Sequence, residues 1–228
     1  MQLTEQQTRL IERTINAIES GSPEGNYAAL AVYADGPHNV RQITYGRAQT
    51  TEYGNLRELV RMYVAANGRL AAALANDVPR IGRTPLTDDL RFRALLRDAG
   101  RNDPAMRRIQ DRFFDSRYFR PAIDWAERHG FALPLSALVI FDSFIHSGGM
   151  PSALCRRIGV RMPAAGGDER AWIDAYVRIR HDWLRHHPRA ALHATIYRTH
   201  AWLEQIAKGN WDLAQMPLRV NGIDVTPG

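Results

Sequence analysis

The chain has 228 residues, of which 45% are hydrophobic and 24% charged, a balance typical of a globular protein with a substantial core. The longest apolar run, Leu133–Phe144, is shorter than the roughly 20 residues that cross a bilayer, which excludes a membrane-spanning segment. A single cysteine, Cys155, excludes an internal disulfide, and the net charge of +6 favours anionic partners.

The first predicted elements are a helix and a β-hairpin. Thr4 and Gln7 have the spacing of a capping box, and apolar residues follow at helical spacing until Gly21 ends the helix. Two partly β-prone runs then flank a turn that contains Asp35-Gly36-Pro37. The two strands of this hairpin are predicted at residues 27–33 and 41–45.

The rest of the chain reads almost entirely as helix, because its apolar residues recur with a period near 3.6. The chain is therefore predicted to be α+β and mostly helical, with a small β element near its amino end. Helices are predicted at Leu56–Leu74, at 88–98, from Asp103, from Arg120, at Pro134–Gly148, at Asp168–Arg185 and at Arg189–Ala207, before a tail at 214–228.

Two carboxylates stand out by their positions: Glu19 at the end of the first helix, and Asp35 at the turn of the hairpin. An inverting glycosidase needs a protonated acid and an ionised carboxylate about 6.5–9.5 Å apart, with a water between them. Opposite walls of a cleft could supply that spacing. Spacing alone leaves open that both are surface residues at the ends of elements.

Several short segments, in order and spacing, resemble the chitosanases of glycoside hydrolase family 46. The resemblance implies a lysozyme-like fold of two lobes with a cleft between them, as a single catalytic domain. The lobes would be residues 1–60, with the acid, the base and the hairpin, and residues 61–213, mainly helical. The segments that carry the resemblance are 17–19, 33–36, Gly54–Val60, Tyr118–Ala122, 141–142, Gly166–Glu169 and Gly209–Leu213.

The resemblance also implies roles for individual residues. Glu19 matches the family's general acid and Asp35 its general base, while Thr44 is the equivalent of a threonine that orients the attacking water. Asp142 lies on a helix that is apolar nearly all round, so we expect it to be buried and paired with cations. Arg180 and Arg198 match the family's two arginines, which would hold Glu19 in place and tune its acidity. A purely structural ion pair is an equally good interpretation of Asp142.

The sequence departs from the family where the substrate binds. A substrate-binding aspartate of the family is Asn55 here, and acidic positions give way to the basic run Arg185–Arg189. These changes favour peptidoglycan over polycationic chitosan as the substrate. A true chitosanase is the second hypothesis, and a non-catalytic module that binds cell walls is the third. Tyr27 or Tyr45, near the acid and base, is the candidate for stacking on a sugar ring.

No other chemistry is indicated by the sequence. Its histidines lack the spacing of a metal site, and it contains no glycine-rich phosphate loop, so neither metal nor cofactor is expected. Its arginines are spread along the chain, which argues against nucleic acid as a partner. We expect a monomer that acts on a polysaccharide outside the producing cytoplasm. No signal peptide is visible at residues 1–13, so the route of delivery stays open.

Overall fold

The computed structural model describes residues 1–47 and 49–228 and confirms a mostly helical fold with a small antiparallel sheet. The chain divides into two compact units, one of residues 1–23 with 116–228 and the other of residues 24–115. These limits differ from the expected lobes, which divided the chain at residue 60. Helices after residue 60 pack with the hairpin's own unit, a long-range arrangement that periodicity along the chain does not report.

The first unit begins with α1, which behaves as its sequence predicts. Thr4 and Gln7 form both hydrogen bonds of the capping box, and Gly21 ends the helix in the left-handed conformation (φ 73°). The described helices and strands of this unit are α1 (Glu5–Ser20), α6 (Arg120–Arg128), α7 (Pro134–Ser147), α8 (Ser152–Cys155), α9 (Glu169–Arg185), α10 (Ala190–His193), α11 (Ile196–Ala207), β4 (Leu218–Val220) and β5 (Ile223–Val225), with a π-helical turn at Asp115–Phe119 leading to α6 and a 3-10 turn at Pro163–Ala165.

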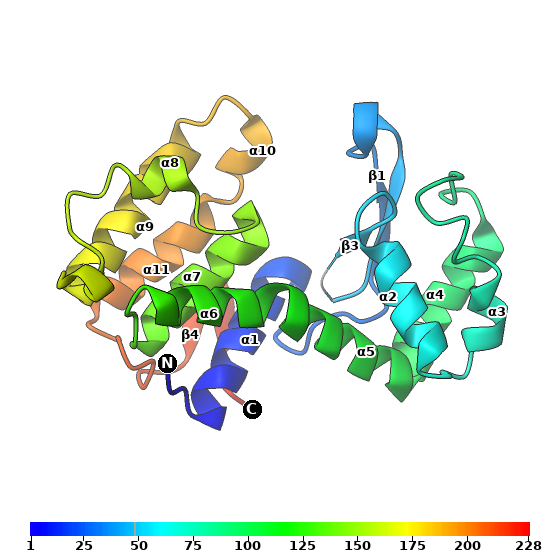
Figure 1. The fold of residues 1–228 in the computed structure, drawn as a ribbon, viewed down its shortest axis with the longest axis horizontal. Helices are drawn as coiled ribbons and strands as arrows, with labels where there is room; N and C mark the ends of the chain where they lie inside the picture. Colours follow the sequence, from blue (N-terminus) through cyan, green and yellow to red (C-terminus); the bar gives the residue numbers. More distant parts are fainter. Residues whose placement is uncertain (48) are drawn as a thin grey trace. The chain divides into compact units, whose positions relative to one another are not determined.

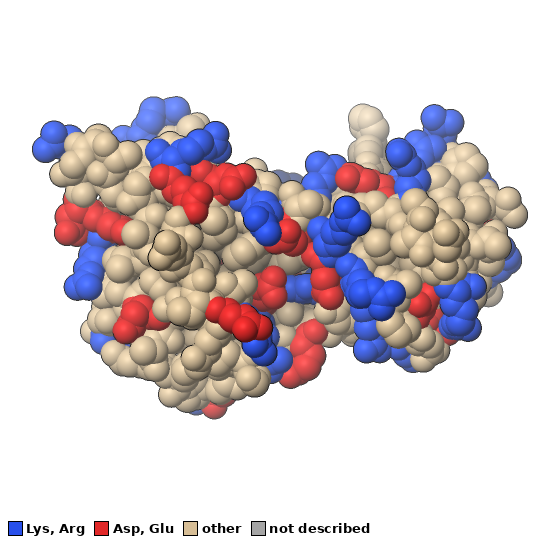
Figure 2. All heavy atoms as spheres, turned by 60° about the horizontal axis from the view of Figure 1, so that its bottom comes forward, with Lys and Arg blue, Asp and Glu red and all other residues tan. Residues whose placement is uncertain are grey.

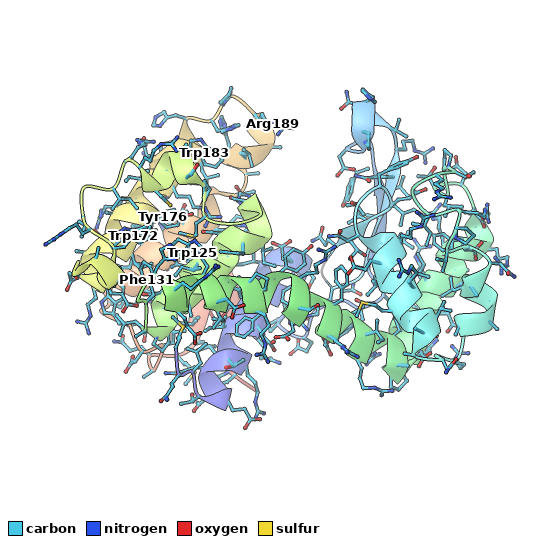
Figure 3. All side chains as sticks on the ribbon, viewed as in Figure 1. Trp125, Phe131, Trp172, Tyr176, Trp183 and Arg189 are labelled. Atoms are coloured by element: carbon cyan, nitrogen blue, oxygen red, sulfur yellow. The ribbon has the colours of Figure 1, made fainter. Side chains whose placement is uncertain are left out.

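The core of this unit is built around α7, whose first ten residues are all buried. Helix α7 packs against α1, α6 and α9, and α9 packs against α11 (Figure 1). A group of aromatic rings fills the space beside it. Trp172 stacks on Tyr176 at 5.6 Å and meets Phe131 edge-on at 5.1 Å, with Trp125 next to both Trp172 and Phe131 (Figure 3).

Two predictions for the carboxyl-terminal part were wrong. The expected tail at 214–228 contains β4 and β5, which pair with each other and pack on α1, and Arg13 donates from Nε to the carbonyl of Thr226 at 2.8 Å. Buried Leu218, Val220 and Val225 hold this hairpin to the core. The helix expected at 189–207 is two helices, α10 and α11.

The second unit is a small sheet beside four helices. Its described elements are β1 (Leu30–Tyr33), a 3-10 turn at Pro37–Asn39, β2 (Gln42–Tyr45), β3 (Thr50–Thr51), α2 (Leu56–Ala65), α3 (Ala71–Ala75), α4 (Leu90–Asn102) and α5 (Pro104–Phe114). Strand β2 lies between β1 and β3, and both pairs are antiparallel. The predicted hairpin is thus confirmed, and β3 is an addition that its two-residue length hid from sequence analysis.

The prediction of one long helix at Leu56–Leu74 was wrong, because a turn separates α2 from α3. Asn67 adopts a positive φ of 50°, and a Cβ on Gly68 would lie 2.0 Å from the ring of Tyr63. The Tyr63 hydroxyl donates to Asp103 Oδ2 at 2.5 Å and accepts from the backbone N–H of Leu70 at 2.9 Å. This buried tyrosine therefore fixes the turn that periodicity alone reads as continuous helix.

The surface of each unit mixes the two signs of charge on the face drawn in Figure 2. Lys and Arg side chains stand among aspartates and glutamates there. Within the described residues, the structure contains no helix long and apolar enough to cross a membrane.

Candidate active site

Glu19 lies in the last turn of α1 and is held from α11. Arg198 donates from Nη2 to Glu19 Oε1, and the Glu19 side chain keeps 16% of its surface exposed. The buried Arg198 side chain is only 6% exposed. A carboxylate at the end of a helix is thus fixed by a cation that solvent hardly reaches, which strengthens their attraction.

Asp142 on α7 lies behind this pair and is completely buried. It accepts from Arg180 Nη1 at 2.6 Å, from Arg198 Nη1 at 2.6 Å and from Trp202 Nε1 at 3.2 Å. Burial raises the pKa of Asp142, but the two guanidinium charges outweigh it and hold the pKa of this carboxyl well below its usual range. Two carboxyl groups and two guanidiniums therefore form one largely buried network. We name Glu19, Asp142, Arg180 and Arg198 the acid network.

A further layer of polar groups surrounds Arg180. Its Nη1 also donates to Ser143 Oγ at 3.2 Å, and Ser143 Oγ lies 2.8 Å from the hydroxyl of Tyr176. Its Nη2 lies 3.1 Å from His146 Nδ1. Because arginine can only donate, this nitrogen of His146 must be the acceptor. Burial and the charges of Arg180 and Arg198 lower the pKa of His146 to about 4, so the imidazole is neutral near pH 7.

Sequence analysis missed His146, Ser143 and Trp202 as members of this layer. The signal for His146 was present, because it follows Asp142 by four residues and so shares its helix face. Trp202 follows Arg198 by four residues in the same way. Neither spacing identifies a partner until the packing of α7, α9 and α11 is known.

Asp35 lies in the other unit, at the turn between β1 and β2, and its side chain is exposed. Its Oδ1 accepts a hydrogen bond of 2.9 Å from Nε2 of Gln42, a residue that sequence analysis missed. The turn is closed by a bond from the Gly36 N–H to the carbonyl of Val40 at 3.0 Å. A Cβ on Gly36 would lie only 2.7 Å from that oxygen, so this turn requires glycine.

The strand register places three residues of the hairpin on one face of the sheet. Tyr33 is paired with Gln42, and Thr44 follows Gln42 by two residues, so their side chains point to the same side. Thr44 is 8% exposed, and its hydroxyl oxygen has no hydrogen-bond partner among residues 1–47 and 49–228. This face therefore carries a buried hydroxyl with no described hydrogen-bond partner beside the residue that binds Asp35.

The three candidates for sugar binding, Tyr45, Tyr27 and Asn55, differ in their exposure and in their hydrogen bonds. Tyr45 is fully buried and donates its hydroxyl to the carbonyl of Leu96 at 2.7 Å, so it cannot stack on a sugar, and that prediction was wrong. Tyr27 is half-buried, and its hydroxyl donates to Asp111 at 2.8 Å. Asn55 precedes α2, half-buried, and its side chain makes no capping hydrogen bond.

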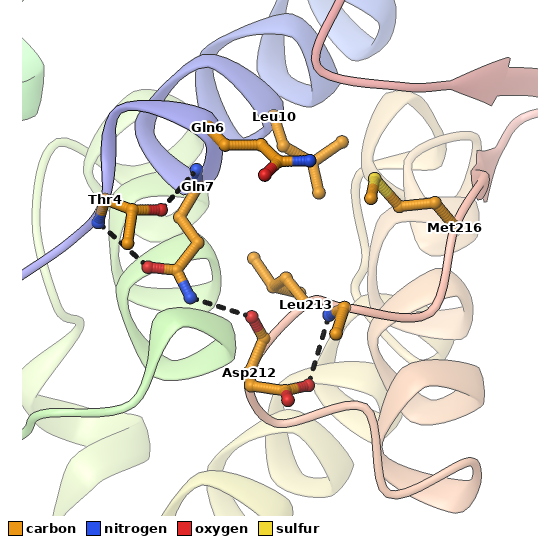
Figure 4. A pocket seen from close by; sticks show the side chains of 8 residues that line it. Thr4, Gln6, Gln7, Leu10, Asp212, Leu213 and Met216 are labelled. Carbon is orange, nitrogen blue, oxygen red and sulfur yellow. Dashed lines mark hydrogen bonds between the residues drawn. The ribbon is translucent and has the colours of Figure 1, made fainter.

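Three cavities, each within one unit, include neither carboxylate. One of about 280 Å³ lies between the start of α1 and the segment 212–216 (Figure 4). Another of about 400 Å³ lies between α9, α11 and the β4–β5 turn, and a third of about 340 Å³ includes Tyr27. Among the described residues, no three His, Cys, Asp or Glu side chains are grouped to hold a metal ion.

The mostly helical fold thus has one carboxylate bound by a buried arginine and another at a β-turn. An acid–base glycoside hydrolase needs two such carboxyl groups. The chain belongs to glycosyl hydrolase family 46, whose model matches residues 15–218. This range includes Glu19, Asp35 and the whole acid network, and the protein is a glycosidase of the chitosanase type.

The relatives support this assignment along the whole chain. The sequence is 28% identical over 225 residues to a chitosanase of Bacillus subtilis strain 168, covering 91% of this chain and 79% of that protein. The solved complex of a Gynuella sunshinyii family 46 chitosanase with chitotetraose is 28% identical, with a TM-score of 0.83 over 98% of each chain. A native chitosanase of Bacillus subtilis MY002, 22% identical, shares the fold with a TM-score of 0.81 over 97% of each chain.

Proposed function

We propose that this protein is an inverting, endo-acting hydrolase of β-1,4 linkages in a glucosamine polymer, and that chitosan is its substrate. The acid network carries the catalytic part of this proposal, because it fixes a carboxyl group at the end of α1 by a buried cation. The relatives carry the choice of polymer, since those described above are chitosanases and one is complexed with chitotetraose.

In the proposed reaction, Glu19 protonates the glycosidic oxygen as the bond breaks. Asp35 accepts a proton from the water that attacks the opposite face of the sugar, and Thr44 orients that water through its uncommitted hydroxyl. Asp142 and Arg180 touch no substrate in this scheme. They hold Arg198, which holds Glu19, and so act as positioning residues.

Peptidoglycan is the second candidate, favoured by charge. Asn55 stands where the family has a substrate-binding aspartate, and Arg185, His186 and Arg189 are exposed on and just after α9. Protonated chitosan would gain nothing from such groups, whereas an acetylated or anionic glycan would not be repelled. Both polymers lie outside the cytoplasm that makes this protein, and we propose that it acts there as a single catalytic domain.

Digestion of the two polymers in parallel tests the choice of substrate. The purified protein is incubated with chitosan and with purified peptidoglycan, and reducing ends and product masses are measured. Soluble oligosaccharides from chitosan alone are expected. Products from peptidoglycan alone would overturn the choice of chitosan, and the masses would then identify the bond cleaved.

Two variants test the assignment of acid and base. Glu19→Gln and Asp35→Asn each should lower kcat by at least about 100-fold, the usual range for loss of a general acid or base. Glu5→Gln, on an exposed position of the same helix α1, is the matched control and should retain full activity. Unchanged cleavage by Glu19→Gln would refute the assignment, and polymer binding without products from wild type would favour a binding module. NMR detection of the first anomer released tests inversion.

A further inference from the structure

Gln42 is fixed at both ends of its amide group. This first residue of β2 is only 5% exposed. Its Oε1 accepts from the backbone N–H of Tyr53 at 3.3 Å, and its Nε2 donates to Asp35 Oδ1 at 2.9 Å. Because the Tyr53 N–H can only donate, the amide oxygen must face Tyr53, and the NH₂ group must face Asp35. The direction of the bond to Asp35 is therefore set by the backbone N–H of Tyr53, two residues after β3.

The turn that carries Asp35 is closed on itself. The Gly36 N–H bonds to the Val40 carbonyl, and the Asn39 and Val40 N–H groups bond back to Gly36 and Pro37. A Cβ on Gly36 would also meet the ring of Tyr53 at 3.2 Å. Residues 36–40 thus form a compact loop closed by the bond between Gly36 and Val40, and the contact of Asp35 with Gln42 joins the chain on either side of it.

The donor that holds Asp35 is neutral. Among the described residues, no Lys, Arg or His nitrogen lies within ion-pair distance of this carboxylate, and the nearby Arg41 is paired instead with Asp88 at 3.5 Å. A cation would stabilise the ionised form strongly and weaken a base, whereas an amide fixes the carboxylate at a smaller cost in basicity. With Oδ1 occupied by Gln42, Oδ2 is the oxygen left to accept a proton from water.

We propose that Gln42 is the positioning residue of the catalytic base: its amide sets the orientation of Asp35 so that the second carboxylate oxygen receives the proton of the attacking water. This inference rests on the proposed role of Asp35. Exposed Tyr33 and uncommitted Thr44 share the strand face of Gln42, so the hairpin supplies the base, its orienting amide and a hydroxyl from one small sheet.

Two substitutions separate the bond to Asp35 from the bond to Tyr53. Gln42→Met keeps the volume of the side chain but removes both bonds, and kcat should fall about tenfold, with KM within about twofold. Gln42→Glu keeps an acceptor for the Tyr53 N–H but places a second carboxylate against Asp35. Two adjacent carboxylates do not both ionise readily, so the acidic limb of the kcat/KM profile should move up by about one pH unit.

A matched control measures the effect of losing a buried glutamine elsewhere. Gln205 on α11 is 2% exposed and accepts from Asn210 Nδ2 at 2.8 Å, so Gln205→Met should lower Tm with an unchanged pH profile. Gln42→Asn, which retains a shorter amide, should recover part of the kcat lost in Gln42→Met. The proposal is overturned if Gln42→Glu leaves the acidic limb in place while remaining folded, or if Gln42→Met changes only Tm.

A separate outcome would contradict the proposed function and not only the role of Gln42. If Asp35→Asn remains active, Asp35 is not the base, and the glycosidase mechanism has to be reassigned. If Asp35→Asn is inactive but the Gln42 variants keep the wild-type kcat and pH profile, the role of Asp35 stands and only that of Gln42 is lost.

Discussion

The carboxylate of Glu19 is held by charge in a buried network drawn from four helices, whereas that of Asp35 is held by a neutral amide at an exposed turn. The Glu19 side chain contacts Arg198, which is itself fixed by Asp142, and Asp142 is fixed again by Arg180. Asp35 has one described hydrogen bond, and the residue that makes it comes from the next strand of the same hairpin.

Because of this difference, substitutions in the two units should affect folding stability to different extents. Breaking a buried ion pair leaves an uncompensated charge in a medium of low dielectric, which costs several kcal/mol. Losing one neutral bond at an exposed turn costs little folding free energy, although it frees a carboxylate to rotate. Substitutions around Glu19 should therefore damage folding and activity together, and substitution of the exposed Asp35 itself should damage activity with little loss of stability.

Removal of Asp142 is expected to give the largest loss of stability. Asp142→Ala leaves the buried guanidinium of Arg180 without its carboxylate and leaves the buried Arg198 with Glu19 as its ion-pair partner. The free energy of unfolding should fall by about 3–5 kcal/mol, as measured by urea denaturation near pH 7.

The matched control for this loss is Asp224→Ala on β5. Asp224 is 58% exposed and 3.8 Å from Arg219, so its removal should change stability by less than about 0.5 kcal/mol. Equal effects of the two variants would mean that the acid network does not stabilise its unit.

His146, which contacts Arg180, makes the stability of the first unit depend on pH. Burial first, and then Arg180 and Arg198, lower its folded-state pKa to about 4, below the unfolded value of about 6.5. The unfolded chain therefore binds more protons between these values, and stability must fall as pH decreases from 6.5 towards 4. His146→Gln, which keeps an acceptor for Arg180, should remove about 1–2 kcal/mol of this fall, allowing for partial exposure of the ring.

Denaturation midpoints at pH 7.5 and pH 4.5 check this prediction. Wild type should lose more stability between the two than His146→Gln, and His186→Gln on an exposed position after α9 should behave as wild type. An identical loss in all three proteins would show that His146 stays neutral in both states or titrates normally in both. The sign is the same for Asp142: its lowered pKa also makes stability fall with decreasing pH, but only in the more acidic range below the unfolded pKa of an aspartate.

Local signals predicted local structure well. The capping box at Thr4, the glycine stop at Gly21 and the turn at Asp35-Gly36-Pro37 each depend on a few neighbouring residues, and the structure has all three features. What failed were features set by distant contacts. Tyr63 bonds to Asp103, forty residues away, and thereby breaks the helix expected to continue to Leu74.

The same limit of sequence analysis applies to the acid network and to the hairpin. A charged residue on an otherwise apolar helix is expected to be buried and therefore to need a partner, so Asp142 could be identified from the sequence alone. Gln42 carries no such signal, because a glutamine near the start of a strand is ordinary. Its contact with Asp35 depends on the strand register that pairs it with Tyr33 and on the turn that brings Asp35 close to it.

Two tyrosines of the hairpin differ in their exposure and lie on opposite faces of the sheet. Tyr33 is 54% exposed on the face of Gln42 and Thr44, while Tyr45 is fully buried on the opposite face and donates to the Leu96 carbonyl. Tyr45→Phe should lower the free energy of unfolding by about 1 kcal/mol, the value of one buried hydrogen bond, with KM unchanged.

Tyr33→Ala should do the reverse. Loss of an exposed aromatic ring that a sugar can stack on should raise KM about fivefold, equivalent to about 1 kcal/mol, without lowering Tm. Tyr33→Phe keeps the ring and should keep the wild-type KM. If Tyr33→Ala binds substrate normally, the strand face next to Asp35 is not a binding surface, and the exposure of Tyr33 has no role in catalysis. If instead Tyr45→Phe changes KM, the buried face of the hairpin affects the turn that holds Asp35.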